Sequence, residues 1–458
     1  MKAAMNVVLF STYELGRQPF GLASPAAWLR EAGAQVTCID LAVDALDEDA
    51  IRAAGLICFY VPMHTATRIA VSAVQRIRAF NSQARLCFYG LYASMNTEFL
   101  RGHGVDFILS GEFEERLVQL YRQLLKGANG SEIREHALVS LDKLNFRVPA
   151  RTDLPELTSY AALQLPDGPT RTVGYTEASR GCKHFCRHCP VVPVYQGSFR
   201  VVQPEIVLAD IRNQVEAGAE HITFGDPDFF NGIGHATKLV QALHREFPHL
   251  TYDVTIKVEH LLKYRKHVPL LRDTGCLFVV TAVESLDNHI LDLLDKGHTE
   301  EDFNELVEVF REARLTLAPT FVTFTPWTTM DGYLYLLRRL AELGLTENVA
   351  PIQLAIRLLI PSGSLLLELP EVQEIIGKFD PAALCYPWQH PDSRMDEFHT
   401  ELNELLSHAD GAQSRSEVFE CVWEAAHRKA ERPAHPIPQP DSIVSRAAIP
   451  YLTEPWYC

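Results

Sequence analysis

The chain has 458 residues, of which 47% are hydrophobic and 22% charged, and its formal net charge is −16 at pH 7. This length predicts two or three domains, and this composition is typical of globular proteins. The acidic balance disfavours nucleic acid as a partner, because nucleic-acid binders need a basic footprint. No apolar run approaches the ~20 residues that span a bilayer, and the apolar N-terminal stretch is too short for a signal peptide. We therefore expect no membrane partner and a cytoplasmic location.

The first 130 residues alternate between short apolar strands and helices. Strands are predicted at 6–11, 35–41, 56–62, 84–90 and 106–110, and helices near 25–32, 47–54, 65–80, 95–103 and 113–126. The first helix is expected to have Ser24 as its N-cap and Pro25 at its first position. This alternation predicts an α/β domain with a doubly wound, mostly parallel sheet of the Rossmann-like kind, whose ligands bind beyond the carboxyl ends of the strands.

Residues 131–170 are predicted to be a linker, because polar residues and prolines interrupt any periodicity. A second alternation follows, with strands predicted at 172–179, 221–226, 251–258, 276–284, 316–325 and 352–360. Six strand–helix units indicate a partial (β/α)6 TIM-like barrel over 171–365, with its chemistry at the carboxyl ends of the strands. Residues 366–458 do not continue this alternation of strands and helices. They are expected to form a small helical cap, with helices near 394–408 and 416–428, and a tail that ends in Cys458.

Three cysteines, Cys182, Cys186 and Cys189, follow the first barrel strand with the spacing C-x3-C-x2-C. Three thiolates on one loop can hold three irons of a [4Fe-4S] cluster and leave the fourth iron open. A structural zinc site is the competing interpretation, with His184 or His188 as the fourth ligand, although no second cysteine pair lies nearby. Four further cysteines lie in or beside apolar runs and are expected to be buried and unreactive: Cys38, Cys58, Cys87 and Cys276.

Over residues 171–365 the sequence resembles the radical S-adenosylmethionine (SAM) superfamily. Besides the cysteine loop, the resemblance rests on TFGDPD at 223–228, ES at 284–285 and RLLIPSGS at 357–364. It implies that SAM chelates the open iron, and that one electron from the cluster cleaves a sulfonium C–S bond to give a carbon radical. It also implies SAM contacts for six residues: His188, Gly225, Asp226, Glu284, Ser285 and Arg357.

Several of these assignments stay open. His188 stands where the superfamily more often has tyrosine, phenylalanine or tryptophan. Glu284 has the alternative role of a satisfied polar residue at a strand end. Arg357 has the alternative role of an ion-paired structural arginine, and Asp226 has the alternative role of a helix cap.

The N-terminal segment resembles the cobalamin-binding-type domain that precedes the barrel in many radical SAM proteins. PFGL at 19–22, LREAG at 29–33 and GVDFILSGE at 104–112 carry this resemblance, which makes cobalamin a candidate cofactor. Two departures matter. The D-x-H-x-x-G signature of histidine-ligated cobalamin proteins is absent from residues 11–16, and Tyr89-Gly90 stands where a Gly-Gly pair is common, so that a ring is expected in the nucleotide-tail groove. The alternative is a domain without cobalamin that only shapes the entrance to the site.

The sequence therefore predicts a radical SAM enzyme that modifies a small molecule. The reaction would be transfer of a methyl or another SAM-derived group, or a rearrangement, with electrons from a donor such as flavodoxin or ferredoxin. The alternative from another class is a zinc-stabilised ligand-binding or regulatory protein without turnover.

The chain end resembles a subgroup of radical SAM proteins whose tails carry Cys-Cys or Cys-selenocysteine before Ala-Glu-Pro. This resemblance raises the hypothesis that the sequence is cut short at a recoded stop codon. It also implies a catalytic role for Cys458, because a reactive pair could bind trivalent arsenic or deliver hydrogen to a product radical. Alkyl transfer to a soft element such as arsenic is thus a further alternative.

Overall fold

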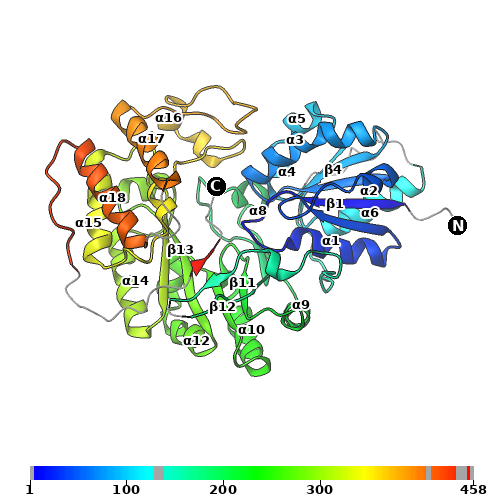
Figure 1. Cartoon of the computed structure of the whole chain (residues 1–458), viewed down its shortest axis with the longest axis horizontal. Coiled ribbons are helices and arrows are strands. Elements are labelled where there is room, and N and C mark those ends of the chain that lie inside the picture. The colour runs from blue at the N-terminus through cyan, green and yellow to red at the C-terminus, as the bar shows by residue number, and fades with distance from the viewer. Residues whose placement is uncertain (1–4, 128–138, 167, 409–413, 440–450, 454–458) are drawn as a thin grey trace.

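The structure is a computed structural model that describes residues 5–127, 139–166, 168–408, 414–439 and 451–453. Figure 1 shows an N-terminal domain in blue and cyan beside a barrel in green and yellow, with C-terminal helices in orange on the far side of the barrel. No helix of the described residues is long and apolar enough to cross a membrane. The predicted α/β architecture is confirmed.

A parallel sheet of six strands forms the centre of the N-terminal domain, in the order β2-β1-β3-β4-β5-β6. Each face of the sheet has its own hydrophobic core, as a doubly wound domain requires. The segment predicted to be a linker contributes the sixth strand. The strands are β1 (Asn6–Ser11), β2 (Gln35–Asp40), β3 (Leu56–Tyr60), β4 (Arg85–Tyr89), β5 (Phe107–Gly111) and β6 (Val139–Ser140).

Two groups of helices cover this sheet. On one face lie α1 (Phe20–Glu31) and α6 (Glu114–Leu125). On the other lie α2 (Glu48–Ala53), α3 (His64–Phe80), α4 (Leu91–Met95) and α5 (Thr97–Gly102).

The start of α1 differs from the prediction, because the helix begins at Phe20 and Pro25 lies inside it. Proline has no N–H to donate to the carbonyl four residues earlier, which here belongs to Gly21. The hydroxyl of Tyr89 donates to that carbonyl instead, at 2.8 Å. Ser24 is not the N-cap either, since its hydroxyl donates to Glu114 at 2.6 Å. Tertiary partners therefore override the local capping pattern.

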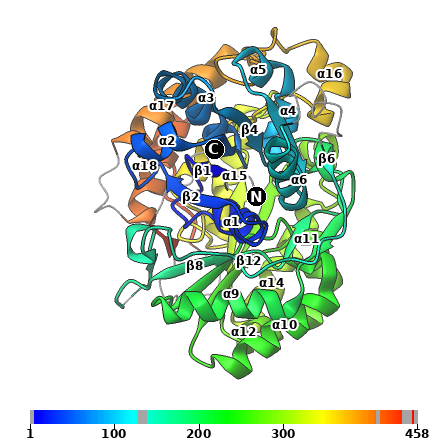
Figure 2. The ribbon, with the colours of Figure 1, turned by 90° about the vertical axis from the view of Figure 1, so that its right-hand side faces the viewer.

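Five parallel strands form the partial barrel, in the order β14-β13-β12-β11-β8. Figure 2 shows its covering helices α9, α10, α12 and α14 on the side away from the N-terminal domain. The strands are β8 (Val173–Thr176), β11 (His221–Phe224), β12 (Thr251–Thr255), β13 (Cys276–Glu284) and β14 (Thr316–Phe321). The helices are α9 (Pro204–Glu216), α10 (Ile233–Glu246), α11 (Val258–Lys263), α12 (Val268–Asp273), α14 (Glu300–Ala313) and α15 (Met330–Glu342).

The strand predicted at 352–360 is wrong in its extent. Pro351–Leu354 form a 3₁₀ helix (η4), and Arg357 makes only a single parallel bridge to Phe324. Pro351 starts this 3₁₀ turn and cannot donate to a strand ladder. The sixth unit thus closes the barrel edge without a regular strand.

The C-terminal region contains α16 (Pro370–Gln373), α17 (Ser393–Ser407) and α18 (Arg415–Lys429), which confirms both predicted helices. Residues of α17 and α18 belong to the hydrophobic core of the barrel. The short strand β15 (Tyr451–Leu452) pairs antiparallel with β7 (Leu163–Gln164), and Leu452 packs against the barrel strands. Cys458 lies outside the described residues.

Gly111 ends β5 where only glycine fits. Its φ is +72°, and an added Cβ would lie 2.1 Å from the carbonyl oxygen of Ser140 on β6. Gly104 has a similar φ of +77° with open space around it. We expect Gly111→Ala to lower the free energy of unfolding by about 2–4 kcal/mol, from left-handed strain plus overpacking, and Gly104→Ala by about 1 kcal/mol from strain alone. Urea denaturation measures the free energy of unfolding of both variants. Equal losses in the two would show that the contact with Ser140 does not make glycine necessary at position 111.

Asp40 ends β2 as a buried carboxyl that accepts a hydrogen bond from the hydroxyl of Tyr160 at 2.9 Å. Burial raises the pKa of Asp40 to about 6, whereas an unfolded aspartate titrates near ~4. The folded chain therefore holds this proton more tightly, and its stability falls as pH rises from about 4 to about 6.

Asp40→Asn removes this titration. We expect it to gain stability relative to the native chain by about 1–3 kcal/mol between pH 4 and pH 7. Denaturant midpoints at both pH values measure the gain, with the exposed Asp49→Asn as control. A stability difference between the variant and the native chain that is the same at pH 4 and pH 7 would refute the raised pKa of Asp40.

Candidate functional site

The three cysteines lie on the loop between β9 (Ser179–Gly181) and α8 (Val191–Tyr195). β9 pairs antiparallel with β10 (Phe199–Val201), so that the chain on both sides of the loop is fixed. Cys182 and Cys186 are buried and Cys189 is half-buried. Burial raises the pKa of the Cys182 thiol, and it raises the pKa of Cys189 to about 12. A metal that binds here must therefore displace protons from these thiols.

Arg187, in the middle of this loop, fastens it to two other parts of the barrel. Its backbone N–H donates to the carbonyl of Leu294 at 2.9 Å, next to α13 (Asn288–Leu293). Its own carbonyl accepts a hydrogen bond from the hydroxyl of Ser364 at 3.0 Å. The turn at 361–364 therefore positions the cysteine loop.

Two buried lysines face the cysteines and were missed as functional residues from the sequence. The Nζ of Lys257, just after β12, lies 3.4 Å from the Sγ of Cys186. Lys296 is buried near Cys186 and Cys189. Although burial lowers its pKa, Glu284 and these cysteines raise it overall. Two buried cations beside three thiols fit a cofactor that carries negative charge, and the donor set fits a [4Fe-4S] cluster. A lysine directly after an apolar strand is the only signal that the sequence offers for Lys257.

Glu284 ends β13 with a φ of +69°, a left-handed conformation that is rare for a residue other than glycine. Its Oε1 lies 3.1 Å from the Nε2 of His188 and 3.2 Å from the Nζ of Lys296. Burial alone would raise the pKa of Glu284, but Lys296 and His188 hold it well below its usual range. The structure thus brings the predicted residues His188 and Glu284 together and keeps the carboxylate ionised.

Gly225 and Asp226 follow β11, where they stabilise the start of the cysteine loop. An added Cβ on Gly225 would lie 1.8 Å from the hydroxyl oxygen of Tyr175. Asp226 accepts hydrogen bonds from the backbone of Ala178 at 2.9 Å and the hydroxyl of Ser179 at 2.5 Å, and burial raises its pKa to about 7. Asp226 therefore caps no helix.

Ser285 and Arg357 have local partners. The Oγ of Ser285 accepts a hydrogen bond from the backbone of Asp287 at 3.0 Å. Arg357 donates to Asp396 at 2.7 Å, and its guanidinium lies 3.6 Å from the centre of the Trp388 ring. These contacts tie Arg357 to the C-terminal cap and agree with the structural alternative for this residue.

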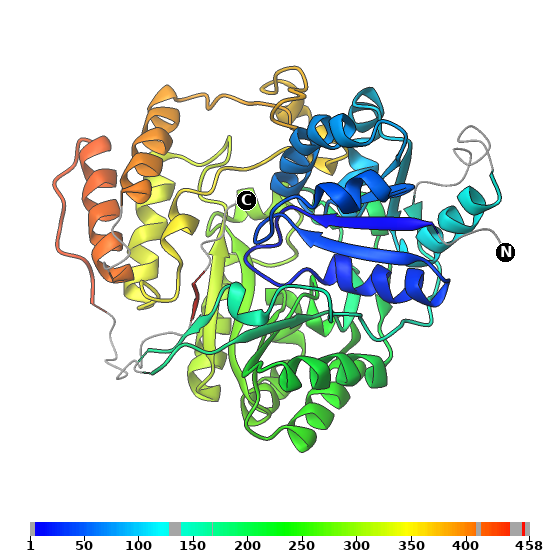
Figure 3. The same ribbon diagram turned by 45° about the vertical axis from the view of Figure 1, so that its right-hand side comes forward.

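A cavity of about 180 Å³ lies between the two domains. In Figure 3 the N-terminal domain, in blue, lies against the green barrel. The carboxyl ends of β3, β4 and β5 line the cavity from one side, and the ends of β8 and β11 line it from the other. Its lining includes Tyr60, Gly90, Gly111, Tyr175, Glu177 and Gly225.

A partial barrel with three thiols on one loop, beside a doubly wound domain, fits an enzyme that uses an iron–sulfur cluster. Residues 176–331 match the Radical SAM superfamily. The chain thus carries a radical SAM domain, preceded by an N-terminal domain of B12-binding-like fold. It is a radical SAM enzyme, and its cofactors include a [4Fe-4S] cluster and SAM.

The chain is similar to a hopanoid C-3 methylase of Methylococcus capsulatus, with 24% identity over 337 residues that cover 70% of this chain and 64% of that protein. It thus spans a little less than two thirds of that relative. Among solved structures it resembles the cobalamin-dependent SAM radical enzyme OxsB (TM-score 0.70, 93% of this chain and 72% of that one). It also resembles the radical SAM methyltransferase TsrM of Kitasatospora setae (TM-score 0.69, 89% and 90%). Both are 16% identical to this chain, so they show the fold.

Glu284 offers a test of the SAM site. We expect Glu284→Gln to weaken SAM binding by about tenfold or more, because it removes the charge fixed by His188 and Lys296. Isothermal titration of SAM into the cluster-loaded protein measures the change. Glu312→Gln, an exposed acid on α14, is the control for surface charge. Equal SAM affinity in both variants would remove Glu284 from the site.

Proposed function

We propose that this enzyme transfers a methyl group from SAM to a small molecule bound in the cavity between the two domains. The observation that supports this most is the shared cavity, since residues next to the cysteine loop and the carboxyl ends of the N-terminal strands line it together. Such strand ends are where open α/β sheets and barrels bind ligands. The hopanoid methylase and TsrM, whose names state methyl transfer, support the same reaction class.

The cysteines Cys182, Cys186 and Cys189 would hold three irons. When bound, the cluster would supply the electron that breaks a sulfonium C–S bond of SAM and so generates a carbon radical. Lys257 and Lys296 offset the negative charge at the cysteines, and Glu284 presents a fixed carboxylate at the end of β13. The docked N-terminal domain limits the access of water to this edge of the barrel.

The N-terminal domain fits cobalamin in part. Gly90 and Gly111 line the cavity with backbone at the ends of their strands. The groove between α1 and the sheet is filled, because Tyr89 is fully buried there and packs against Tyr60 and Phe113. A cavity of about 180 Å³ is also smaller than a whole corrinoid. We therefore propose cobalamin as the methyl carrier with its nucleotide tail outside this groove, and with Tyr60 displaced.

Anaerobic reconstitution tests the proposal. We expect the full chain to take up iron and sulfide at about four each. We then expect it to consume SAM with dithionite, which replaces the electron donor that we propose to be flavodoxin or ferredoxin. Zinc without SAM consumption would support the regulatory alternative instead.

The products of SAM identify the group that is transferred. Loss of the methyl group leaves S-adenosylhomocysteine, loss of the aminocarboxypropyl group leaves methylthioadenosine, and a radical-only reaction leaves 5′-deoxyadenosine and methionine. Methyl transfer predicts S-adenosylhomocysteine, formed only when hydroxocobalamin is added, beside the 5′-deoxyadenosine that forms when the carbon radical from a second SAM takes a hydrogen atom. Methylthioadenosine without any corrinoid requirement would overturn the proposal and favour transfer of another SAM-derived group.

A further inference from the structure

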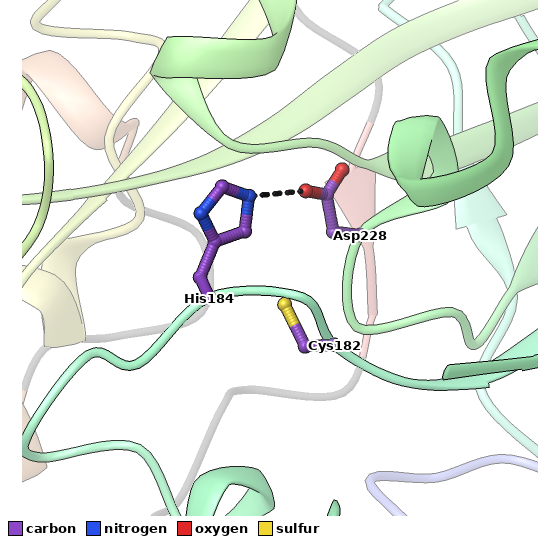
Figure 4. Close-up of side chains that lie close together, drawn as sticks. All are labelled: Cys182, His184 and Asp228. Carbon is purple, nitrogen blue, oxygen red and sulfur yellow. Dashed lines mark ion pairs between the residues drawn. The ribbon is translucent and has the colours of Figure 1, made fainter. Parts of the chain in front are cut away.

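A second set of metal-binding side chains lies beside the cysteine loop. The ligand atoms of Cys182, His184 and Asp228 all lie within 4.8 Å of one another. Figure 4 shows the imidazole of His184 and the carboxylate of Asp228 facing each other, with the thiol of Cys182 next to them. His260, at the end of the neighbouring strand β12, adds a second imidazole, and its Nδ1 lies 2.6 Å from the Oδ2 of Asp228.

These atoms do not satisfy one another through hydrogen bonds. The Nε2 of His184 lies 3.4 Å from the Oδ2 of Asp228, and the Nδ1 of His260 lies closer still, yet neither contact has hydrogen-bond geometry. All three atoms are buried without a hydrogen-bond partner among the described residues. A buried polar atom without a partner destabilises the folded chain. One cation between them would satisfy all three at once.

The surroundings are those of metal ligands. Oδ1 of Asp228, the other carboxylate oxygen, accepts a hydrogen bond from the backbone of Phe230 at 3.1 Å, which fixes the carboxylate. The other ring nitrogen of His184 lies 3.4 Å from a carboxylate oxygen of Glu259. A histidine that binds a metal commonly donates its second N–H to such a carboxylate.

We propose that the cluster-free protein binds one divalent ion of the zinc type through Cys182, His184, Asp228 and His260. Thiolate, imidazole and carboxylate are the ligand types that Zn²⁺ prefers. Cys182, His184 and Asp228 already lie close enough to share an ion, and His260 would complete a tetrahedral site by moving away from its 2.6 Å contact with Asp228. This site and the cluster use the same sulfur of Cys182, so they exclude each other. The exclusion rests on the assignment of Cys182 to the cluster. His188 lies outside this group of ligands, and its Nε2 contacts Glu284.

The consequence is that bound zinc would control the assembly of the iron–sulfur cluster. An ion at this site occupies the first cysteine of the loop and leaves Cys186 and Cys189 free, which cannot hold the three-thiolate cluster. Zinc would have to leave, and Cys182 would have to be released, before iron and sulfide assemble. Cluster loading would then depend on the free zinc concentration.

Anaerobic titration of the chelator-treated full chain with Co²⁺, followed by displacement with Zn²⁺, tests the site. We expect one Co²⁺ per chain, with the intense visible bands of a tetrahedral site and a thiolate charge-transfer band. Asp228→Asn and His184→Gln should lower the ion affinity by at least ~10–100-fold and still assemble the cluster. Cys186→Ser and Cys189→Ser should keep the ion and lose the cluster, and Cys182→Ser should lose both. The exposed His249→Gln is the control for histidine content.

A competition experiment completes the test. Zinc added before iron and sulfide should suppress the cluster chromophore in the native chain and leave that of Asp228→Asn unaffected. Ion binding that survives in Asp228→Asn and His184→Gln but disappears in Cys186→Ser would overturn the proposal, because the three thiols alone would then bind zinc. A native chain without a cobalt–thiolate band would overturn it as well. These readouts do not involve SAM, so failure of the proposed methyl transfer would leave them intact.

Discussion

Replacing Cys189 with serine is expected to abolish the cluster and all cleavage of SAM. Serine is a harder and far less acidic ligand than the cysteine thiol, and two thiolates cannot fix three irons. We expect iron to fall from about four per chain to below about one after anaerobic reconstitution. SAM consumption with dithionite should fall to the level of the chelator-treated protein.

The matched control is Cys421→Ser. Cys421 is an exposed cysteine on α18, far along the chain from the loop. It should keep the full iron content and the native rate of SAM consumption. A Cys189→Ser protein that still binds about four irons and consumes SAM would show that another ligand completes the cluster, and the loop would lose its assigned role.

The sequence revealed the parts of the site that adjacent residues encode. The spacing of Cys182, Cys186 and Cys189 is a local property, and so is the position of Glu284 at the end of an apolar strand. Lys257 could not be assigned in this way, because it meets Cys186 only in the folded chain, where the segment after β12 lies against the cysteine loop. His260 likewise meets Asp228 through the fold and not through any pattern.

The fold shows the same division. Strands with strong apolar patterns were placed correctly, because burial on both faces of a parallel sheet leaves a clear signal. The region at 352–360 has the same apolar character but lies at the barrel edge, where Pro351 and a single bridge replace a strand. The start of α1 depended on the hydroxyl of Tyr89, which replaces the N–H that Pro25 lacks. The aromatic ring expected in the nucleotide-tail groove is that of Tyr89, and its hydroxyl stabilises α1 through the hydrogen bond to Gly21.

Arg180 is the residue whose loss should destabilise the protein most. It stands two positions before Cys182 and extends into the N-terminal domain, where it is 6% exposed. Its guanidinium donates to both carboxylate oxygens of Glu114 at 2.9 and 2.7 Å, and its Nε donates to Glu177 at 2.7 Å. Glu112 lies 3.4 Å away, and burial raises its pKa to about 7. One cation thus holds three carboxylates between the domains.

Arg180→Met leaves these carboxylates buried without their cation, and we expect the free energy of unfolding to fall by about 3–5 kcal/mol. The loss should be larger at pH 8 than at pH 5.5. Burial already raises the pKa of Glu112, so without Arg180 the folded chain holds more protons on this carboxyl than the unfolded chain does, and its stability falls as pH rises. Guanidinium denaturation at both pH values measures the effect. Arg122→Met, on the exposed side of α6, should be neutral.

The triple variant Arg180→Met/Glu112→Gln/Glu114→Gln separates charge from packing. It removes both carboxylates of the N-terminal domain together with their cation and leaves only Glu177, so it should recover most of the loss at pH 8 and reduce the dependence on pH. If the loss of stability is the same at both pH values and in the triple variant, its cause is instead the loss of packing between Arg180 and three rings. These belong to Phe20, Phe113 and Phe146. Because Arg180 leads directly into the cysteine loop, iron retention in the single variant reports whether domain docking also holds the loop in place.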